Sequence, residues 1–571
     1  MLKKTAILIA LSLFFVVEVN AQNWSTHCGN NERNGISELP GPKNINTPLW
    51  TIGNATPTGL GMNIYSFGDL FVTSRVDFSP YNAIIECRNL MTGALVWTSP
   101  NLGAASILFA IGFNEDAVYA HDYHSNLIYA LHASDGSVKW VSDFESYTFG
   151  PMDGVIFTCN RDIIINGGVG SNESTLCLNK ETGEIRWANL NWFAVTPNET
   201  KAAHGDRLYM ITGAITQPIK LVAVDMETGE NLYYSESLPG DGDQEGPIAV
   251  SPDGTIYFRR DGGNLFAIAD NGSGFDILWT RTPINMGPFF MNYGIDPKGN
   301  LLLMDNGKIY RLNKSDGSPM DSSLVNTFNS GRITVDSDSV VYVNNTEGDY
   351  YALTYDLQTT LWSTLTMNGN YYAGPSISKE GIMVMCGAGN SIKAYKYNGT
   401  HAPVADFEAS RYHIYTGQSV AFHDKSSFSP SSWNWEFTGG NPPNSTDMHP
   451  MGIYYDEPGS YPVKLIATNE SGTDTVTKMC YIEVELYEGV EPHTPLVNTR
   501  ISPNPVREFA VLSSDEASEI SIFNSIGKVV YQDKKATRER RINFSDFSSG
   551  IYFVQFTGDG FTRSEKLVVG N

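Results

Sequence analysis

The residues best suited to chemistry stand together in one short segment, His121-Asp122-Tyr123-His124. Two imidazoles and a carboxylate can transfer protons or bind a metal ion. In an extended strand, however, residues 121 and 124 point to opposite faces, so only a tight turn would bring the two histidines together. A solvated turn is the simpler interpretation, and His121, Tyr123 and His124 are the candidate catalytic residues of a polysaccharide-cleaving alternative.

Aromatic residues recur in segments that we expect to be loops. Side chains of this type can stack on sugar rings or on apolar side chains of a peptide. The alternative is that they pack against one another and fill the interior between the loops. Arginines nearby, Arg259 and Arg260 together with Arg75, would add positive charge for an acidic ligand. The candidate aromatic residues are Tyr147, Phe149, Trp192, Phe193, Phe289, Phe290, Tyr371 and Tyr372.

Three acidic residues, Asp241, Asp243 and Glu245, alternate in a glycine-rich segment. Carboxylate oxygens are suitable calcium ligands, but this cluster fits no complete calcium-loop pattern, and a solvated acidic loop is the preferred interpretation. The chain has no Gly-x-Ser-x-Gly, no His-Glu-x-x-His and no phosphate-binding loop. We therefore expect no cofactor, with calcium as the one alternative.

The elements that would position these residues form an internal repeat between about residues 47 and 398. Trp97, Trp140 and Trp187 are 43 and 47 residues apart, and the next intervals, 92 and 83 residues to Trp279 and Trp362, are double steps. The missing tryptophans would lie near Tyr233 and Met320. A period of about 41–47 residues is the size of one four-stranded propeller blade.

The ends of the repeat predict a closed ring. Trp50 precedes Trp97 by 47 residues and has no blade of its own, whereas the strand at 391–397 lacks a following tryptophan segment. We therefore expect residues 48–52 to complete the last blade, which hides sheet edges that would otherwise pair with other chains. This pattern predicts eight blades. Seven is the alternative, because the repeat is weakly marked near Met320.

Two of the six cysteines, Cys87 and Cys177, occupy a repeat position where other copies have alanine. This predicts small buried side chains rather than a disulfide framework. The form Ala-Leu followed by Gly-x-x-x-Trp, as in Ala130-Leu131 to Trp140, resembles the quinoprotein-type repeat. That repeat occurs in eight-bladed pyrroloquinoline quinone dehydrogenases and also in propellers that are not enzymes. The chain lacks the adjacent cysteine pair of many such dehydrogenases, so the resemblance implies the fold and not the activity.

The period stops near Ala402, and short alternating strands up to about Glu485 predict a β-sandwich. The pattern resembles a PKD domain, an Ig-like module common in bacterial exoproteins, which would serve as a spacer or bind glycans or proteins. Where that family has Trp-x-Phe-Gly-Asp-Gly, this chain has Trp435-Glu436-Phe437-Thr438-Gly439-Gly440. The aspartate is missing, and Trp435 is expected in the core.

The last segment combines Pro503-Asn504-Pro505, Asn524-x-x-Gly527-Lys528, Ser549-Gly550-Ile551-Tyr552 and a Lys566-Leu567-Val568-Val569 ending. Its short strands suffice for a small sandwich. This order is similar to the type A sorting domain of the type IX secretion system of Bacteroidetes. The resemblance implies contact with that secretion machinery, passage across the outer membrane, and release or attachment at the surface.

The first residues are typical of a secretory signal: Lys3 and Lys4, an apolar run from Ala6 to Val17, and Ala21 before the expected cleavage point. No other apolar stretch approaches ~20 residues, so we expect no transmembrane segment in the mature chain. The net charge is −24, or −25 without the leader. Such acidity argues against nucleic acid and anionic lipid as partners and favours solubility.

The sequence therefore predicts an all-β chain, with an eight-bladed β-propeller followed by two Ig-like β-sandwich modules. The expected function is an exported cell-surface or secreted protein whose propeller binds a glycan or a protein. The alternative is a secreted polysaccharide lyase or hydrolase with its site on the propeller face. The expected parts are a signal peptide (1–21), the propeller (22–400), the PKD-like sandwich (401–487), a linker (488–497) and the sorting domain (498–571).

Overall fold

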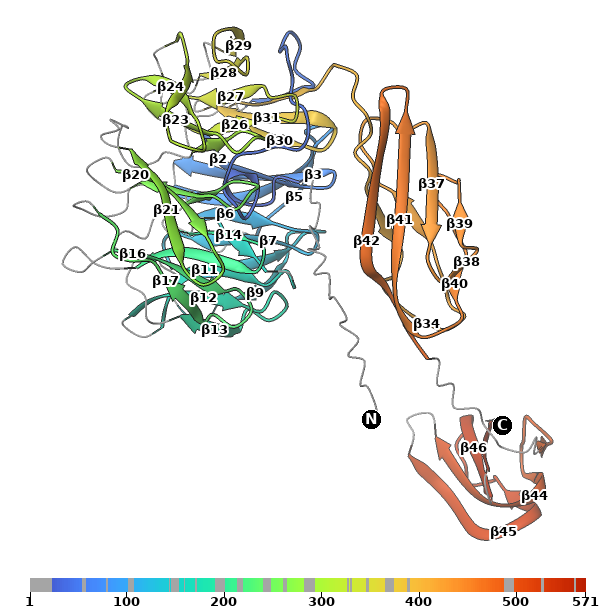
Figure 1. Ribbon diagram of the computed structural model, residues 1–571. Coiled ribbons are helices and arrows are strands. Elements are labelled where there is room, and N and C mark those ends of the chain that lie inside the picture. Colours follow the sequence, from blue (N-terminus) through green and yellow to red (C-terminus); the bar gives the residue numbers. More distant parts are fainter. Residues whose placement is uncertain are drawn as a thin grey trace, which may run out of the picture. The chain divides into compact units, whose positions relative to one another are not determined.

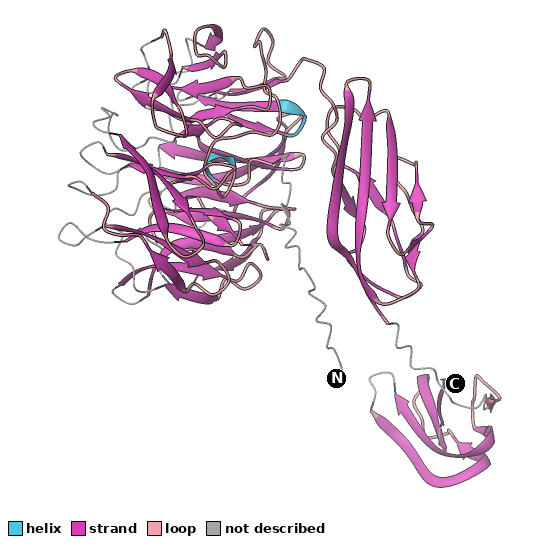
Figure 2. Cartoon of the chain, viewed as in Figure 1, coloured by secondary structure: helices cyan, strands magenta, loops and turns pink. Residues whose placement is uncertain are grey.

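The computed structural model describes residues 23–570, apart from a set of loops, and almost all of its regular structure is β-strand (Figures 1 and 2). Two short 3-10 helices, His27–Gly29 and Lys379–Gly381, are present among the described residues. The chain divides into two compact units, one up to Val484 and one from Glu485. The residues outside the description are 54–57, 79–80, 101–106, 143, 145–153, 159, 170–171, 190–200, 213–218, 240–247, 260–263, 282–292, 326–327, 329–330, 346–348, 365–373, 388–390, 487–497, 525–527 and 559–560.

Eight antiparallel four-stranded sheets, the blades, make up the described part of residues 50–396, which confirms the predicted propeller. In blades one to seven the strands pair in chain order. The blades are β2–β5 (Thr58–Phe67, Leu70–Phe78, Tyr81–Asn89, Leu95–Thr98), β6–β9 (Leu108–Phe113, Ala117–Asp122, Ile128–His132, Val138–Val141), β10–β13 (Ile156–Phe157, Ile163–Val169, Asn172–Leu178, Ile185–Asn189), β14–β17 (Lys201–His204, Arg207–Thr212, Lys220–Asp225, Asn231–Tyr234), β18–β21 (Ala249–Val250, Ile256–Arg259, Leu265–Asp270, Phe275–Arg281), β22–β25 (Gly294–Ile295, Leu301–Asp305, Lys308–Leu312, Pro319–Ser322), β26–β29 (Ile333–Val335, Val341–Asn344, Tyr350–Leu353, Thr360–Thr364), and β30–β32 (Ser376–Ser378, Ile382–Gly387, Ser391–Lys396) with β1 (Trp50–Gly53).

The ring closes through its first strand. In the eighth blade β1 pairs with β32, and Trp50 lies opposite Ala394. The count is therefore eight, and the seven-bladed alternative is wrong. Closure by a strand from the other end of the repeat removes the free edges that an open stack of sheets would present.

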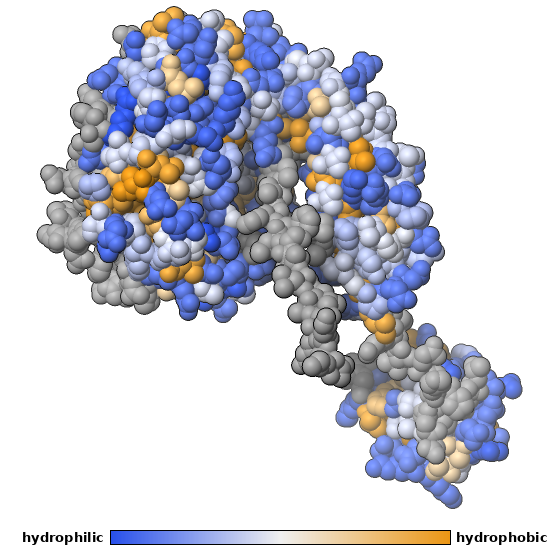
Figure 3. Space-filling model, in the orientation of Figure 1, coloured by the Kyte–Doolittle hydropathy of each residue, from blue (hydrophilic) through white to orange (hydrophobic). Residues whose placement is uncertain are grey.

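The first strand of each blade is the innermost. The strands β6 and β26, for example, are buried along their whole length, whereas in the fourth strands β5 and β9 the tryptophan is buried and the other residues are exposed or half-buried. Apolar residues such as Leu95 and Ile277 are exposed on these outer strands. On the face seen in Figure 3, hydrophilic residues prevail and apolar ones form small separate groups.

Tryptophans on the fourth strands join neighbouring blades. The indole N–H of Trp97 donates to the carbonyl oxygen of Ala133 in the next blade at 2.8 Å, and its ring lies against Gly136. Gly136 has a φ of +73°, so only glycine fits this turn comfortably, both for its backbone and for the ring beside it. The same donation to the next blade, or to the segment before β1, is made by Trp50, Trp140, Trp187, Trp279 and Trp362.

In the fourth and sixth blades, where another residue takes the repeat position of the tryptophan, polar contacts join the blade to the next one. Tyr233 occupies this position in the fourth blade and donates to Asp270 of the fifth at 2.6 Å. In the sixth blade the residue at this position is Asp321, next to the expected Met320, and it pairs with Arg311. The guanidinium of Arg311 stacks 3.7 Å over the Tyr355 ring of the seventh blade. Charge and hydrogen bonds thus replace the indole.

Cys87 and Cys177 lie opposite Trp97 and Trp187, at the position that Ala130 takes opposite Trp140. Both thiols are free and buried. This confirms the prediction of small buried side chains, since the wide indole leaves room for only a small cross-strand partner.

The PKD region forms sheets from ten strands, with Trp435 fully buried in its core as predicted. The N–H of Phe428 donates to Glu380 of the propeller at 2.9 Å, and the Phe428 ring meets the edge of Tyr397. The strands are β33 (Phe407–Ala409), β34 (His413–Tyr415), β35 (Ser419–Val420), β36 (Phe422–Asp424), β37 (Ser432–Phe437), β38 (Gly440–Asn441), β39 (Asn444–Ser445), β40 (Ile453–Tyr455), β41 (Gly459–Asn469) and β42 (Gly472–Glu485).

The C-terminal unit joins two of the motifs noted in its sequence. The side-chain amide of Asn504, in Pro-Asn-Pro, donates to the carbonyl of Lys566 at 2.7 Å and accepts the N–H of Val568 at 2.9 Å. This asparagine therefore holds the last strand in place. The strands are β43 (Thr499–Ser502), β44 (Phe509–Asn524), β45 (Val529–Asn543), β46 (Gly550–Gly558) and β47 (Phe561–Val569).

Candidate functional site

The propeller channel has two distinct ends. In each blade the first strand leads to the end of the channel at which the chain turns back into the second strand. We call this end the clasp end. The opposite end, the loop end, carries the hairpins between second and third strands and the connections from one blade to the next. The predicted ligand residues belong to the loop end, so the state of both ends decides where a ligand can enter.

The N-terminal segment, residues 23–43, which we call the clasp, lies along the clasp end. It runs past the blades in chain order, and most of its residues from Trp24 to Pro42 are buried. Its carbonyl oxygens accept N–H groups near the ends of the first strands at 2.8–2.9 Å. The pairs are Trp24 with Ser66, Ser25 with Phe113, Asn31 with Ala203, Glu32 with Val250, Asn34 with Ile295 and Gly35 with Val335.

The third and eighth blades are contacted differently. The amide of Asn31 exchanges hydrogen bonds with the backbone of Phe157, at 2.8 and 3.0 Å, and the buried Arg33 donates to Gly154 at 2.7 Å. Leu39 packs in the apolar cluster that includes Ile377 of the eighth blade. The clasp thus touches every blade.

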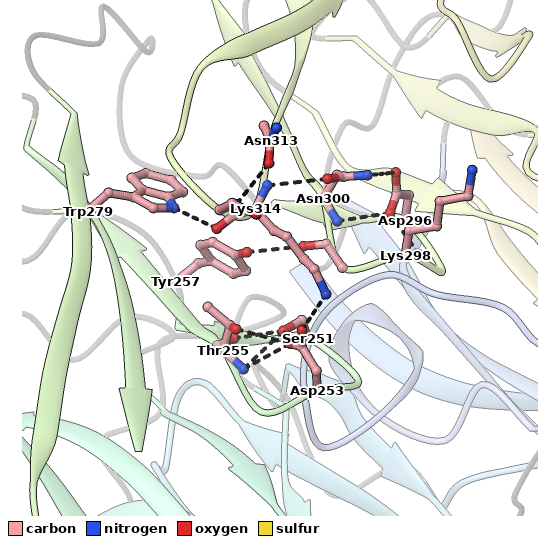
Figure 4. Close-up of polar contacts among 12 residues, drawn as sticks. Ser251, Asp253, Thr255, Tyr257, Trp279, Asp296, Lys298, Asn300, Asn313 and Lys314 are labelled. Atoms are coloured by element: carbon pink, nitrogen blue, oxygen red, sulfur yellow. Dashed lines mark hydrogen bonds and ion pairs between the residues drawn. The ribbon is translucent and has the colours of Figure 1, made fainter. Parts of the chain in front are cut away.

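Tight turns hold the first-strand ends in position for the clasp. Directly after Ile295, the carboxylate of Asp296 accepts the N–H groups of Lys298 and Asn300, each at 2.9 Å (Figure 4). Ser251 does the same in the fifth blade, where its hydroxyl accepts the N–H of Thr255 at 3.0 Å. In the seventh blade Asp336 accepts the N–H of Val340 and also that of Gly41 in the clasp, both at 2.7 Å.

An ion pair ties two of these blades together. The ammonium of Lys314 lies 2.7 Å from Asp253, and the Trp279 indole donates to the Lys314 carbonyl, as Figure 4 shows. Burial raises the pKa of Asp253, but hydrogen bonds from Lys314, Ser251 and Thr255 outweigh it and bring the pKa to about 2. This cluster is structural, because its polar groups satisfy one another.

The histidine segment does not form a combined site. His121 lies in β7 with no exposed surface, and neither ring nitrogen has a hydrogen-bond partner. Burial lowers its pKa to about 4, so the ring is neutral at physiological pH. His124 lies in the following turn and is exposed, as is Tyr123. The turn itself is held by Asp122, which accepts the N–H of His124 at 3.1 Å.

Most of the other predicted site residues lie outside the described residues. Arg259 is described: it ends β19 at the loop end and is only 8% exposed. Arg75 lies in β3 and pairs with Glu86 at 3.3 Å. The residues that lie outside are Tyr147, Phe149, Trp192, Phe193, Arg260, Phe289, Phe290, Tyr371, Tyr372, Asp241, Asp243 and Glu245.

Two further cations at the loop end were not predicted. Lys201 begins the innermost strand β14 and is 1% exposed, and its ammonium contacts the amide oxygen of Asn166. Arg332 directly precedes β26 and is 9% exposed. The sequence signal for them was weak, since each is a single basic residue before a short apolar strand. With Arg259 they place three basic residues at inner strand ends of the loop end.

Comparison with known families identifies three regions. Residues 82–323 match the family described as outer membrane protein assembly factor BamB, 400–484 match the PKD domain, and 500–570 match the secretion system C-terminal sorting domain. A comparison with curated proteins found no match. The three regions agree with the resemblances seen in the sequence.

Among solved structures, the chain is similar to quinohemoprotein alcohol dehydrogenases. The enzyme from Comamonas testosteroni is 13% identical, with a TM-score of 0.50 over 66% of this chain and 81% of the enzyme. ADHIIG from Pseudomonas putida HK5 is also 13% identical, with a TM-score of 0.51 over 67% of this chain and 81% of that one. At this identity the likeness shows the fold alone.

The described cysteines lie apart from one another. Cys87, Cys177 and Cys386 are buried in three different blades and none is adjacent in sequence to another cysteine. Among the described residues, no group of three histidines, cysteines or acidic residues is placed to hold a metal ion. Within the same residues, no helix has the length and apolar character needed to cross a membrane.

Proposed function

We propose that this chain, in which a propeller of PQQ-type repeats and a PKD domain precede a secretion-system sorting domain, is a binding protein that holds a glycan or a protein at the loop end of its propeller. The sorting domain directs the chain across the outer membrane to the cell surface or the medium. The partner is therefore a molecule met outside the cell.

The clasp is the observation that carries this proposal. It lies along the opposite end of the channel and uses the backbone N–H groups of the first strands there, which favours the loop end as the place where a ligand binds. Ligand sites are concave and combine apolar walls with a few polar groups. The aromatic loop residues, such as Trp192 and Phe193, would supply the walls.

The charges at the loop end favour an acidic ligand. Lys201, Arg259 and Arg332 lie at the inner strand ends there, and each is nearly buried. Positive charge in a site of low exposure attracts anions more strongly than it would on an open surface. A uronic-acid-containing glycan or an acidic peptide segment would meet this requirement.

The polysaccharide-cleaving alternative has less support. His121 is fully buried and His124 is exposed in a turn, so the two imidazoles do not face a common space. A general acid and base must both come within hydrogen-bond reach of the same bond. Binding without turnover is therefore the function that we favour.

A ligand screen combined with a turnover assay tests the proposal. The mature chain would be applied to an array of neutral and acidic glycans and used to capture surface proteins, and the same polysaccharides would be incubated with it and analysed for cleavage. We expect saturable binding, stronger for acidic ligands, with every polysaccharide intact. Cleavage of a polysaccharide without any retained ligand would overturn the proposal.

A further inference from the structure

The clasp differs from the rest of the propeller in how it is attached. Residues 24–42 form none of the blades, yet their backbone is paired with the first strands of six blades and their side chains contact the other two. The segment from residue 43 to residue 49, by contrast, is mostly exposed and leads into β1. The clasp, which includes the 3-10 helix His27–Gly29, is thus joined to β1 by an accessible connection.

We propose that the ends of the eight first strands form a continuous groove for a peptide segment. In this protein the groove binds residues 24–42 of the same chain, and this bound segment locks the ring from inside. The groove is a binding site in its own right, distinct from the loop end.

Main-chain pairing provides the affinity of this site. Six clasp carbonyls accept strand N–H groups at 2.8–2.9 Å, and Trp24 also donates to Ser66 at 3.1 Å. Pairing of this type is how proteins bind extended peptides along a sheet. Without the clasp these N–H groups would face water, so each of the hydrogen bonds contributes about 0.5–1.5 kcal/mol.

Side chains provide the register. The amide of Asn34 donates to Val250 at 3.0 Å, while its oxygen accepts the N–H of Ile36 at 3.0 Å. Arg33 is completely buried and reaches Gly154 on the third blade. A peptide shifted by one residue would place the guanidinium where Asn34 now lies, so only one register satisfies the groove.

A glycine marks the tightest approach. Gly35 has a φ of +70°, and a Cβ there would collide with the carbonyl oxygen of Ile333. Gly205 offers a matched comparison because its φ is +62° and nothing lies within 4 Å of an added Cβ. Gly35→Ala and Gly205→Ala therefore carry the same backbone penalty, and only the first adds a collision in the groove.

The test is to cut the connection in the folded protein. A recognition sequence for a specific endoprotease is inserted between Asn44 and Thr47, the chain is folded and cleaved, and the two parts are passed over a size-exclusion column. We expect the clasp peptide to co-elute with the propeller and to separate only in denaturant. Fluorescently labelled synthetic peptide 23–44 should then rebind to the stripped and refolded propeller, and a peptide of scrambled sequence should not.

The two alanine variants, Gly35→Ala and Gly205→Ala, test whether the contacts in the groove hold the clasp in the cleaved protein. In the cleaved protein we expect Gly35→Ala to release the clasp at least about tenfold faster than Gly205→Ala, a difference of ~1.4 kcal/mol. The proposal is overturned if the wild-type peptide leaves the column separately from an unchanged propeller, or if both alanine variants release it at the same rate. Because the cleavage is made after folding, a chain that needs the clasp in order to fold still gives a result.

Discussion

Trp50 and Ala394, which are 344 residues apart in the sequence, lie opposite each other in the last blade, and their pairing closes the ring. The Trp50 ring stacks on Phe71 of the first blade with 5.3 Å between centroids and 7° between planes, and its N–H donates to the carbonyl of Leu90 at 2.9 Å. One side chain therefore joins the last blade to the first.

Trp50→Ala should destabilise the propeller by about 3–5 kcal/mol, because it removes a buried aromatic side chain and a hydrogen bond between blades. Chemical denaturation followed by tryptophan fluorescence and by circular dichroism measures the change. The neighbour Leu49 is 38% exposed, and Leu49→Ala should change the stability by no more than ~0.5 kcal/mol. Equal effects of the two substitutions would contradict closure through Trp50.

Asp270→Ala should cost about 3 kcal/mol. Its carboxylate accepts hydrogen bonds from Tyr233, Tyr209 and Arg207 at 2.6, 2.8 and 2.9 Å, and the side chain is 5% exposed. Removing it leaves an arginine and two hydroxyls without their acceptor. Asp206 also approaches Arg207, at 3.8 Å, but is 86% exposed, so Asp206→Ala is the control and should have almost no effect.

His121 should make the propeller less stable as the pH is lowered from about 6.5 to 4, whereas Asp336, whose pKa burial raises to about 6, acts in the opposite direction. Burial lowers the pKa of His121 from 6.5 to about 4 in the folded chain, so between these values the unfolded chain binds a proton that the folded chain does not. The contribution is complete above pH 6.5 and is lost as the pH falls, up to about 3 kcal/mol.

His121→Leu should remove this part of the pH dependence, whereas His124→Ala, at an exposed position, should keep it. Denaturation midpoints at a series of pH values from 4 to 7 give the comparison. If the denaturation midpoints of the wild-type chain and of the His121→Leu variant changed with pH in parallel, His121 would not be the buried neutral imidazole described above.

The thiols of Cys87 and Cys177 should not react in the folded protein. Burial raises both pKa values to about 12, so almost no thiolate is present at pH 8, and both side chains have no exposed surface. A colorimetric thiol reagent should label them only after unfolding. Cys87→Ala should cost less than ~1.5 kcal/mol, since Ala130 fills the same position in the next blade. Rapid labelling of either thiol in the native chain would contradict this placement.

The closed ring could be predicted because it depends on spacing. The interval from Trp50 to Trp97 equals one blade. A periodic pattern with one extra strand at its beginning and one strand missing at its end has one simple solution, which is closure of the ring. The polar contacts that replace a tryptophan between two blades were harder to predict from the sequence. Asp270 joins Tyr233 across two blades, and no local pattern connects a tyrosine with an aspartate 37 residues later.

The clasp could not be predicted, because its contacts are made by its backbone. Residues 23–43 have no repeat and no apolar period, and carbonyl groups are the same in every sequence. The residues that are specific to the groove, such as Asn31, Arg33, Asn34 and Gly35, each have an ordinary interpretation as part of a loop. The histidine segment shows the reverse case, since its residue types suggested chemistry while the strand places His121 in the interior.

The central claim is that the ligand binds at the loop end and not at the clasp end. The most direct measurement is the affinity of the best acidic glycan or protein from the screen for three chains: wild type, Trp192→Ala with Phe193→Ala, and Lys298→Ala, whose side chain is exposed at the clasp end. We predict at least about tenfold weaker binding for the loop-end variant, with an unchanged melting temperature, and wild-type affinity for Lys298→Ala. Loss of binding in Lys298→Ala together with full binding in the loop-end variant would contradict the account.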